Sequence, residues 1–152
     1  MPSETIIKAT NLKKRYKGSS EEALSGIDLK IASGEFFGLL GPNAAGKSTL
    51  ISILCGIMSH TSGEVEIFGE RINHKSIILK SRIGLIPQEI ALYPTLTVME
   101  NILYFGQLHG LSGKALKNRV NESIRLFNLS EHQNKPISKC SGGIKRRVNL
   151  IA

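Results

Sequence analysis

Nine consecutive residues in the first third of the chain have the types and spacing needed for phosphate chemistry. The run Gly41-Pro42-Asn43-Ala44-Ala45-Gly46-Lys47-Ser48-Thr49 matches the pattern G-x-x-x-x-G-K-[ST]. Glycines in such a loop let successive backbone N–H groups point into one concavity, where the dipole of a following helix adds positive potential. The pattern predicts a loop that binds the phosphates of a nucleotide.

Side chains of this loop have separate predicted roles. Lys47 is a point charge suited to β- and γ-phosphates, and the Ser48 hydroxyl is suited to a Mg²⁺ ion that bridges the same oxygens. Thr49 is expected to hydrogen-bond a further phosphate oxygen. Ala44 stands where such loops often carry a third glycine, and alanine resists left-handed backbone angles. We therefore expect a negative φ at Ala44.

The flanking residues are those that a phosphate-binding loop requires. Residues 36–40 form an apolar run that predicts a buried strand, and residues 50–57 predict a helix buried on most sides. The order strand, loop, helix separates a nucleotide site from a glycine-rich turn that happens to carry a lysine. Nucleotide binding through residues 41–49 is therefore the main prediction.

Two polar positions outside the loop are further candidates. Tyr16 lies in a basic, glycine-containing connection, residues 13–20, where an aromatic ring could stack on a purine base. A half-buried tyrosine at a strand end is an equally good interpretation. Gln88 follows the apolar run 83–86, which predicts a strand, and ligands of parallel α/β sheets lie beyond the carboxyl ends of strands. Gln88 could thus reach a metal or an attacking water, or it could be a solvated loop residue.

A second potential anion site lies near the end of the chain. Ser141, Gly142 and Gly143 precede a predicted helix over residues 144–152. A hydroxyl and open backbone N–H groups at a helix N-terminus suit an anion. The same three residues are also typical of an ordinary helix cap.

The remaining pattern predicts the supporting elements. Two antiparallel strands precede the phosphate loop, and residues 64–68 alternate as in a half-exposed strand. From Thr97 the period changes to 3.6, with a capping box at residues 97–100. This helix and a second one, at about residues 114–127, predict a helical lobe inserted into an α/β core.

Composition limits the class of protein. At 152 residues and 41% hydrophobic residues, the chain predicts one globular unit. Cys55 and Cys140 show no C-x-x-C spacing, so neither a zinc site nor a disulfide framework is indicated, and a reducing cytoplasm is favoured. The chain begins without a secretory pattern and contains no apolar run long enough to span a membrane, so we expect a soluble, non-exported chain.

The net charge of +8 raises the question of a nucleic-acid partner. The densest basic clusters are Lys13-Lys14-Arg15 and Lys145-Arg146-Arg147. Both are short, which favours ordinary solvated faces and attraction for an anionic nucleotide. No specific nucleic-acid partner is expected.

The phosphate loop, Tyr16, Gln88 and Ser141-Gly142-Gly143, in this order, make the chain resemble the nucleotide-binding subunit of ATP-binding-cassette (ABC) transporters along essentially its whole length. The resemblance implies an α/β fold: a P-loop NTPase core with an N-terminal antiparallel β subdomain and an inserted helical subdomain. Residues 1–152 are then one ABC-type nucleotide-binding domain fragment. Residues 1–90 would form the β and P-loop core, residues 91–140 the helical subdomain and residues 141–152 the start of the signature helix.

The resemblance also implies roles. Residues 41–49 become the Walker A loop, Tyr16 the adenine-stacking aromatic, Gln88 the Q-loop residue and residues 140–144 the signature sequence. The implied ligands are ATP and Mg²⁺. Lys47 and Gln88 would act in catalysis, and Ser48 and Gln88 on the metal. The nucleotide-binding set is Tyr16, Gly41, Asn43, Ala44, Ala45, Gly46, Lys47, Ser48, Thr49, Ser141, Gly142 and Gly143.

The implied partners are a second nucleotide-binding subunit in a head-to-tail dimer and an integral-membrane permease. The location would be cytoplasmic, peripheral on the inner face of the cell membrane through that permease. Residues 92–98 and 141–147 look most like the exporter branch that serves drug and lipid efflux.

The sequence also departs from the family pattern. Ala44 replaces a glycine, and Cys140 and Ile144 replace the commoner residues beside S-G-G. The Walker B strand ending in Asp-Glu, the D-loop and the switch histidine do not occur in these 152 residues, so we expect this chain alone to bind ATP without efficient hydrolysis. Two alternatives remain open: a non-transport ABC ATPase acting on nucleic acid or the ribosome, and an inactive truncated product.

Overall fold

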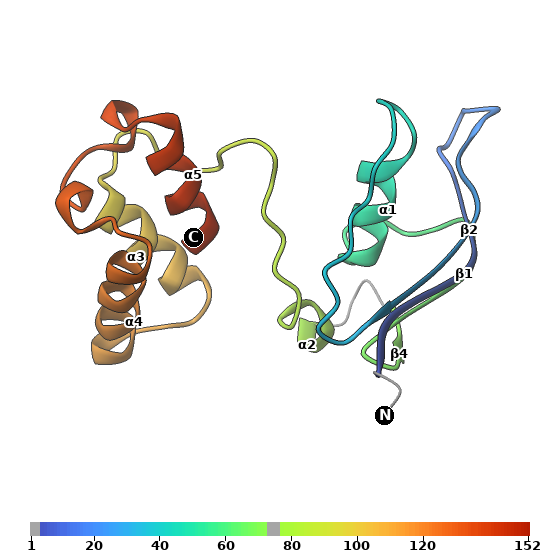
Figure 1. The fold of residues 1–152 in the computed structure, drawn as a ribbon, viewed down its shortest axis with the longest axis horizontal. Helices are drawn as coiled ribbons and strands as arrows, with labels where there is room; N and C mark the ends of the chain where they lie inside the picture. The colour runs from blue at the N-terminus through green and yellow to red at the C-terminus, as the bar shows by residue number, and fades with distance from the viewer. Residues whose placement is uncertain (1–3, 73–76) are drawn as a thin grey trace. The chain divides into compact units, whose positions relative to one another are not determined.

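The computed structural model describes residues 4–72 and 77–152 (Figure 1). The chain divides into two compact units, Met1–Leu85 and Ile86–Ala152. In the part of the chain that the model describes, no helix is both long enough and apolar enough to cross a membrane.

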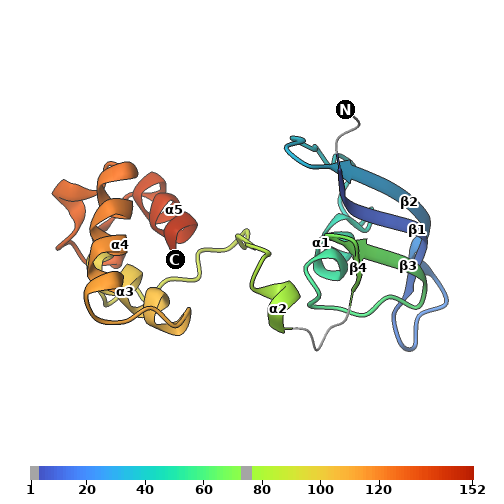
Figure 2. The ribbon, with the colours of Figure 1, turned by 90° about the horizontal axis from the view of Figure 1, so that it is seen from below.

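The first unit is built on an antiparallel sheet (Figure 2). Its strands are β1 (Thr5–Arg15), β2 (Glu22–Ala32), β3 (Ser62–Ile67) and β4 (Glu70–Arg71), in the order β2-β1-β3-β4. All three pairings are antiparallel. The two predicted strands before the phosphate loop and the alternating strand near residues 64–68 are therefore confirmed.

Helix α1 (Lys47–Leu54) follows the phosphate loop, and the short helix α2 (Ile77–Lys80) lies later in the same unit. The core consists of the inward side chains of the strands and the apolar side of the helices, because side chains of a strand alternate between its two faces. Its buried members are Ala9, Leu12, Leu24, Leu50, Ile53, Val65, Ile67 and Leu79. The sheet and its core thus support the start of α1.

Two predicted buried strands are wrong. Residues 36–40 and 83–86 form no strand, and Phe36 and Leu40 are fully or almost fully exposed, at 102% and 93%. A strand persists only when a neighbour accepts and donates its ladder hydrogen bonds. Among residues 4–72 and 77–152, neither run pairs with another strand. Apolar composition alone was therefore not enough to make them strands.

The second unit is helical. It contains α3 (Val98–Leu108), α4 (Gly113–Leu126) and α5 (Gly142–Ile151), with the 3-10 turns η1 (Ser130–His132) and η2 (Ile137–Lys139) between α4 and α5. The predicted capping box is confirmed, because the Thr97 hydroxyl accepts from Glu100 N and the Glu100 carboxylate accepts from Thr97 N. The Glu100 carboxylate accepts from Thr97 N and also from the Thr97 hydroxyl, and these two bonds to the charged form lower the pKa of Glu100.

One buried polar side chain organises the entry to α3. Asn101 is fully buried, and its Oδ1 accepts from Tyr93 N at 2.8 Å. Its Nδ2 donates to the carbonyls of Tyr93, Leu96 and Thr97 at 2.9 to 3.3 Å. A single amide therefore bonds four main-chain groups of the loop that leads into the helix, and it is the acceptor for Tyr93 N.

Candidate functional site

The phosphate loop requires glycine at position 46. Gly46 is the N-cap of α1 and has a left-handed conformation, with φ at 81°. A Cβ atom built there would lie 2.4 Å from the carbonyl oxygen of Ala23 in β2. Both the backbone angle and this close approach exclude a side chain. The second glycine of the motif is therefore what brings the start of α1 against the sheet.

The expectation for Ala44 is wrong. Its φ is +66°, in the left-handed region. A Cβ atom in this region lies too close to the following carbonyl, which costs roughly 1–2 kcal/mol for an L-residue. The loop thus keeps a glycine-like backbone path with alanine in place, and Ala44 is a strained position.

The loop leaves a row of backbone donors unused. Within the described residues, the amides of Gly46, Lys47, Ser48 and Thr49 donate to no carbonyl or side chain, and the Ser48 hydroxyl has no hydrogen bond. The first amides of a helix have no partner within the helix. Four such donors next to an exposed hydroxyl form a donor set suited to phosphate oxygens.

Lys47 folds back over its own loop. Its Nζ donates to the carbonyl oxygens of Gly41 at 2.7 Å and Pro42 at 2.5 Å. These bonds hold the ammonium at the first two residues of the loop, whose last four residues carry the free amides. One loop thus supplies both a unit positive charge and four N–H groups, which an anion site requires.

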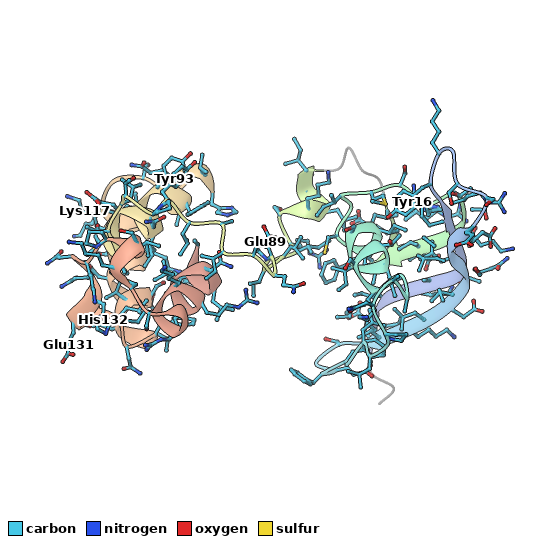
Figure 3. The ribbon with its side chains drawn as sticks, turned by 90° about the horizontal axis from the view of Figure 1, so that it is seen from above. Tyr16, Glu89, Tyr93, Lys117, Glu131 and His132 are labelled. Carbon is cyan, nitrogen blue, oxygen red and sulfur yellow. The ribbon has the colours of Figure 1, made fainter. Side chains whose placement is uncertain are left out.

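Tyr16 directly follows β1 and contacts the first turn of α1. Its hydroxyl lies 2.9 Å from Thr49 Oγ1, and its side chain is 43% exposed (Figure 3). The Lys14 ammonium lies 5.5 Å from the centre of its ring. The structure thus brings together Tyr16 and Thr49, two residues that the sequence assigned to the same nucleotide.

Gln88 belongs to the helical unit, on the extended segment before α3, next to the Glu89 labelled in Figure 3. The residue is exposed. Its main-chain carbonyl accepts from Arg146 Nη1 at 3.2 Å, and Pro87 O accepts from the same nitrogen at 2.9 Å. In the sequence Arg146 is part of a basic cluster, and no local pattern there indicates this contact.

Ser141 is the N-cap of α5, with extended φ and ψ of −66° and 160°. Its side chain makes no capping hydrogen bond, and nothing lies within 4 Å of a Cβ built at Gly142 or Gly143. The hydroxyl and the adjacent backbone are therefore open, in the second unit, whereas the phosphate loop lies in the first.

The two basic clusters are largely engaged within the protein. Lys14 donates to Ser59 O, Arg15 pairs with Glu22, and Arg146 and Arg147 each donate to two main-chain carbonyls. Four of the six cationic side chains thus already bond protein acceptors.

The sequence of the chain matches a known protein family and several known proteins. The family model described as "ABC transporter" matches residues 24–152. Over 97% of its length the chain is 42% identical to the linearmycin resistance ATP-binding protein LnrL of Bacillus subtilis, and over 98% it is 35% identical to the daunorubicin resistance ATP-binding protein DrrA3 of Streptomyces coeruleorubidus. These alignments cover 47% and 46% of the two relatives, so the chain spans about half their length.

A solved structure shows the same fold. The chain superposes on cbiO1 from Clostridium perfringens, described as part of the ABC transporter complex cbiONQ, with a TM-score of 0.87 and 26% identity. The match covers 97% of this chain and 60% of cbiO1. The fold class and the resemblance inferred from the sequence are confirmed. Because the family model matches residues 24–152, well over half of the chain, the chain belongs to the ABC transporter family.

Proposed function

We propose that this chain binds Mg·ATP through residues 41–49 and serves as part of the ATP-binding subunit of an ABC transporter. The observation that carries the proposal is the row of unused amides at residues 46–49, on the same loop as the Lys47 ammonium. A triphosphate is the ligand whose charge and acceptor number match this set. Family membership supports the nucleotide as ATP.

The residues present fit a magnesium nucleotide. The four amides and Lys47 bind phosphate oxygens, with Lys47 moving from the carbonyls of Gly41 and Pro42 to the β- and γ-phosphates. The free Ser48 hydroxyl is the hard oxygen ligand that Mg²⁺ takes, and the ion would neutralise charge on the phosphates. Thr49 bonds a further phosphate oxygen, and the Tyr16 ring stacks on the base.

Replacement of Lys47 by alanine tests the loop. We expect Lys47→Ala to lower the affinity for Mg·ATP, measured by titration calorimetry, at least about tenfold, the effect of losing one charge-assisted contact. Lys30→Ala is the matched control, because Lys30 is an exposed lysine on β2. Equal affinities for Lys47→Ala and Lys30→Ala would refute the assignment of the loop.

We also propose that this chain alone binds ATP without efficient turnover. Hydrolysis requires an oriented water and a base, and a positioned base is typically worth ~10²- to 10⁴-fold. The Gln88 amide can orient a water but has no basic pKa, and the last acidic residue of the chain is Glu131, before the signature residues 140–144. Phosphate release at about one per second or faster from the chain, abolished by Lys47→Ala, would contradict this proposal.

The proposed partners are a second nucleotide-binding subunit and an integral-membrane permease. In a head-to-tail dimer, Ser141, Gly142 and Gly143 would face the nucleotide held by the other subunit. The open Ser141 hydroxyl and the unobstructed glycines support this role. The names of relatives, which include a Nod factor export ATP-binding protein of Paraburkholderia xenovorans, support an export permease.

Membrane fractionation tests the permease partner. We expect the chain to sediment with membranes when its permease is present and to be released when the permease is deleted. Unchanged membrane association after the deletion would refute the partner, and nucleic acid captured with the chain in a salt-dependent manner would favour the non-transport alternative.

A further inference from the structure

Two side chains on one face of α5 hold the segment that carries Gln88. Arg146 Nη1 donates to Pro87 O at 2.9 Å and to Gln88 O at 3.2 Å. Asn149, three residues later, accepts from Ala91 N through Oδ1 at 3.1 Å. Side chains three residues apart lie on the same helix face. Both contacts therefore fasten one segment to one side of α5.

This segment has few other attachments. Residues 86–91 form no helix or strand, and among the described residues they make no hydrogen bond between backbone groups. Within the described residues, each hydrogen bond of this segment has the side chain of Arg146 or Asn149 as its partner. Bonds from an ionised donor such as guanidinium are stronger than those between neutral groups. The two side chains thus determine the path of the main chain at Gln88.

The Asn149 side chain does more than fill space in the core, because it also accepts from Ala91 N. The residue is 7% exposed, and its Nδ2 is buried and has no partner among residues 4–72 and 77–152. A buried donor that is left unsatisfied is unfavourable, and an apolar side chain of similar size would avoid it. The acceptor that Oδ1 provides for Ala91 N is the contribution that offsets this penalty.

The same helix begins at the signature serine. Ser141 is the N-cap of α5, and Arg146 lies five residues further on, about 8 Å along the helix axis at 1.5 Å per residue. We propose that Arg146 and Asn149 are positioning residues that fix the main chain of Gln88 relative to Ser141, so that both move as one body. Only the consequence for nucleotide chemistry rests on the proposed function, because the attachment itself needs no ligand.

Hydrogen exchange of the full chain, measured by NMR without nucleotide, tests the attachment. Arg146→Ala should accelerate exchange of the Ala91 amide about tenfold, although Arg146 does not touch that amide, because the whole segment is released. Arg147→Ala is the matched control, because the Arg147 guanidinium donates to Phe127 O and Asn128 O. This substitution should leave the exchange rate of the Ala91 amide unchanged. Arg146→Lys, which keeps a cationic donor, should restore part of the protection.

The exchange rates of amides in α4 distinguish release of residues 86–91 from destabilisation of the whole helical unit. The amides of Val120 and Ile124 report opening of the helical unit, and Ala91 must accelerate more than they do. Asn149→Leu should also accelerate Ala91 while changing these two amides little, because it removes the unsatisfied donor together with the acceptor. An unchanged Ala91 rate in Arg146→Ala, or equal acceleration in Arg147→Ala, would overturn the proposal.

Nucleotide binding is measured separately on the same variants. Arg146→Ala should keep the wild-type thermal shift with Mg·ATP, because Arg146 lies outside the phosphate loop. If the wild-type chain itself shows no shift, the proposed function fails while the exchange result still decides the attachment. If only Arg146→Ala loses the shift, Arg146 has a direct role in nucleotide binding and its assignment as a positioning residue is wrong.

Discussion

The hydroxyl groups of Tyr16 and Thr49 are hydrogen-bonded, with 2.9 Å between their oxygens. This bond joins the connection after β1 to the first turn of α1. Thr49 is expected to bond a phosphate oxygen and Tyr16 to stack on the base, so this bond joins two residues that are expected to contact one nucleotide.

Substitutions of Tyr16 separate the ring from the hydroxyl. Tyr16→Ala should weaken ATP binding more than binding of inorganic triphosphate, since stacking contributes roughly 0.5 to 1.5 kcal/mol beyond burial. Tyr16→Phe keeps the ring and should bind ATP nearly as well as the wild type. Calorimetric titration with both ligands makes the comparison. Equal losses of affinity for ATP and triphosphate in Tyr16→Ala would show that Tyr16 does not stack on the base.

The left-handed backbone at Ala44 predicts an unusual gain in stability when this residue is replaced by glycine. Ala44→Gly should stabilise the chain by about 0.5–1 kcal/mol, because relief of the strain at φ +66° exceeds the entropy lost by adding a glycine. The neighbouring Ala45 has no positive φ, so Ala45→Gly is the matched control and should destabilise by a similar amount. Urea unfolding measures both. Changes of the same sign would contradict the strain at Ala44.

We expect Asn101→Ala to cause a large loss of stability in the helical unit. Asn101→Ala removes an amide that bonds four main-chain groups of the loop before α3. The three carbonyls also accept from main-chain amides, whereas Tyr93 N has no second acceptor among the described residues. We expect a loss of about 1–3 kcal/mol, the cost of leaving one buried donor unsatisfied. The exposed Asn121 on α4 is the control, and Asn121→Ala should stay within about 0.5 kcal/mol. Similar losses for both would show that burial of the Asn101 amide contributes little.

The capping box predicts a pH dependence with a definite sign. The pKa of Glu100 is lowered from 4.5 in the folded chain, first by the hydrogen bond from Thr97 N. The unfolded chain therefore binds the proton more readily, so this contribution to stability is fully present above pH 4.5 and is lost as the pH falls through the lower folded pKa. Unfolding of the wild type and Glu100→Gln at several pH values tests it. The stability difference between them should shrink below pH 4.5, and a constant difference would exclude the carboxylate as its source.

The parts of the fold that could be predicted are those whose signal is local. The capping box at Thr97 and Glu100 and the alternation of β3 each depend on residues that are neighbours in sequence, and the structure has them. The phosphate loop is local in the same sense: Gly46 adopts the left-handed angle that its motif implies.

The features that were missed depend on distant partners. Residues 36–40 have a strand's composition, but a strand also requires a neighbour to bond, and the sequence does not say whether one is present. Arg146 was assigned to a charged cluster, because no local pattern connects it with Pro87, fifty-nine residues away. The negative φ predicted for Ala44 failed for another reason: the path of the loop outweighed the preference of one residue.

The exposed run at residues 36–40 has a consequence for the behaviour of the chain in solution. Phe36 and Leu40 project apolar surface beside main-chain groups that no strand of the described residues pairs. A run of this kind is a template on which another copy can add a strand. We therefore expect self-association at this run to limit the concentration at which the chain stays dispersed. Phe36→Lys should raise that concentration, because a charge on an open edge opposes strand addition.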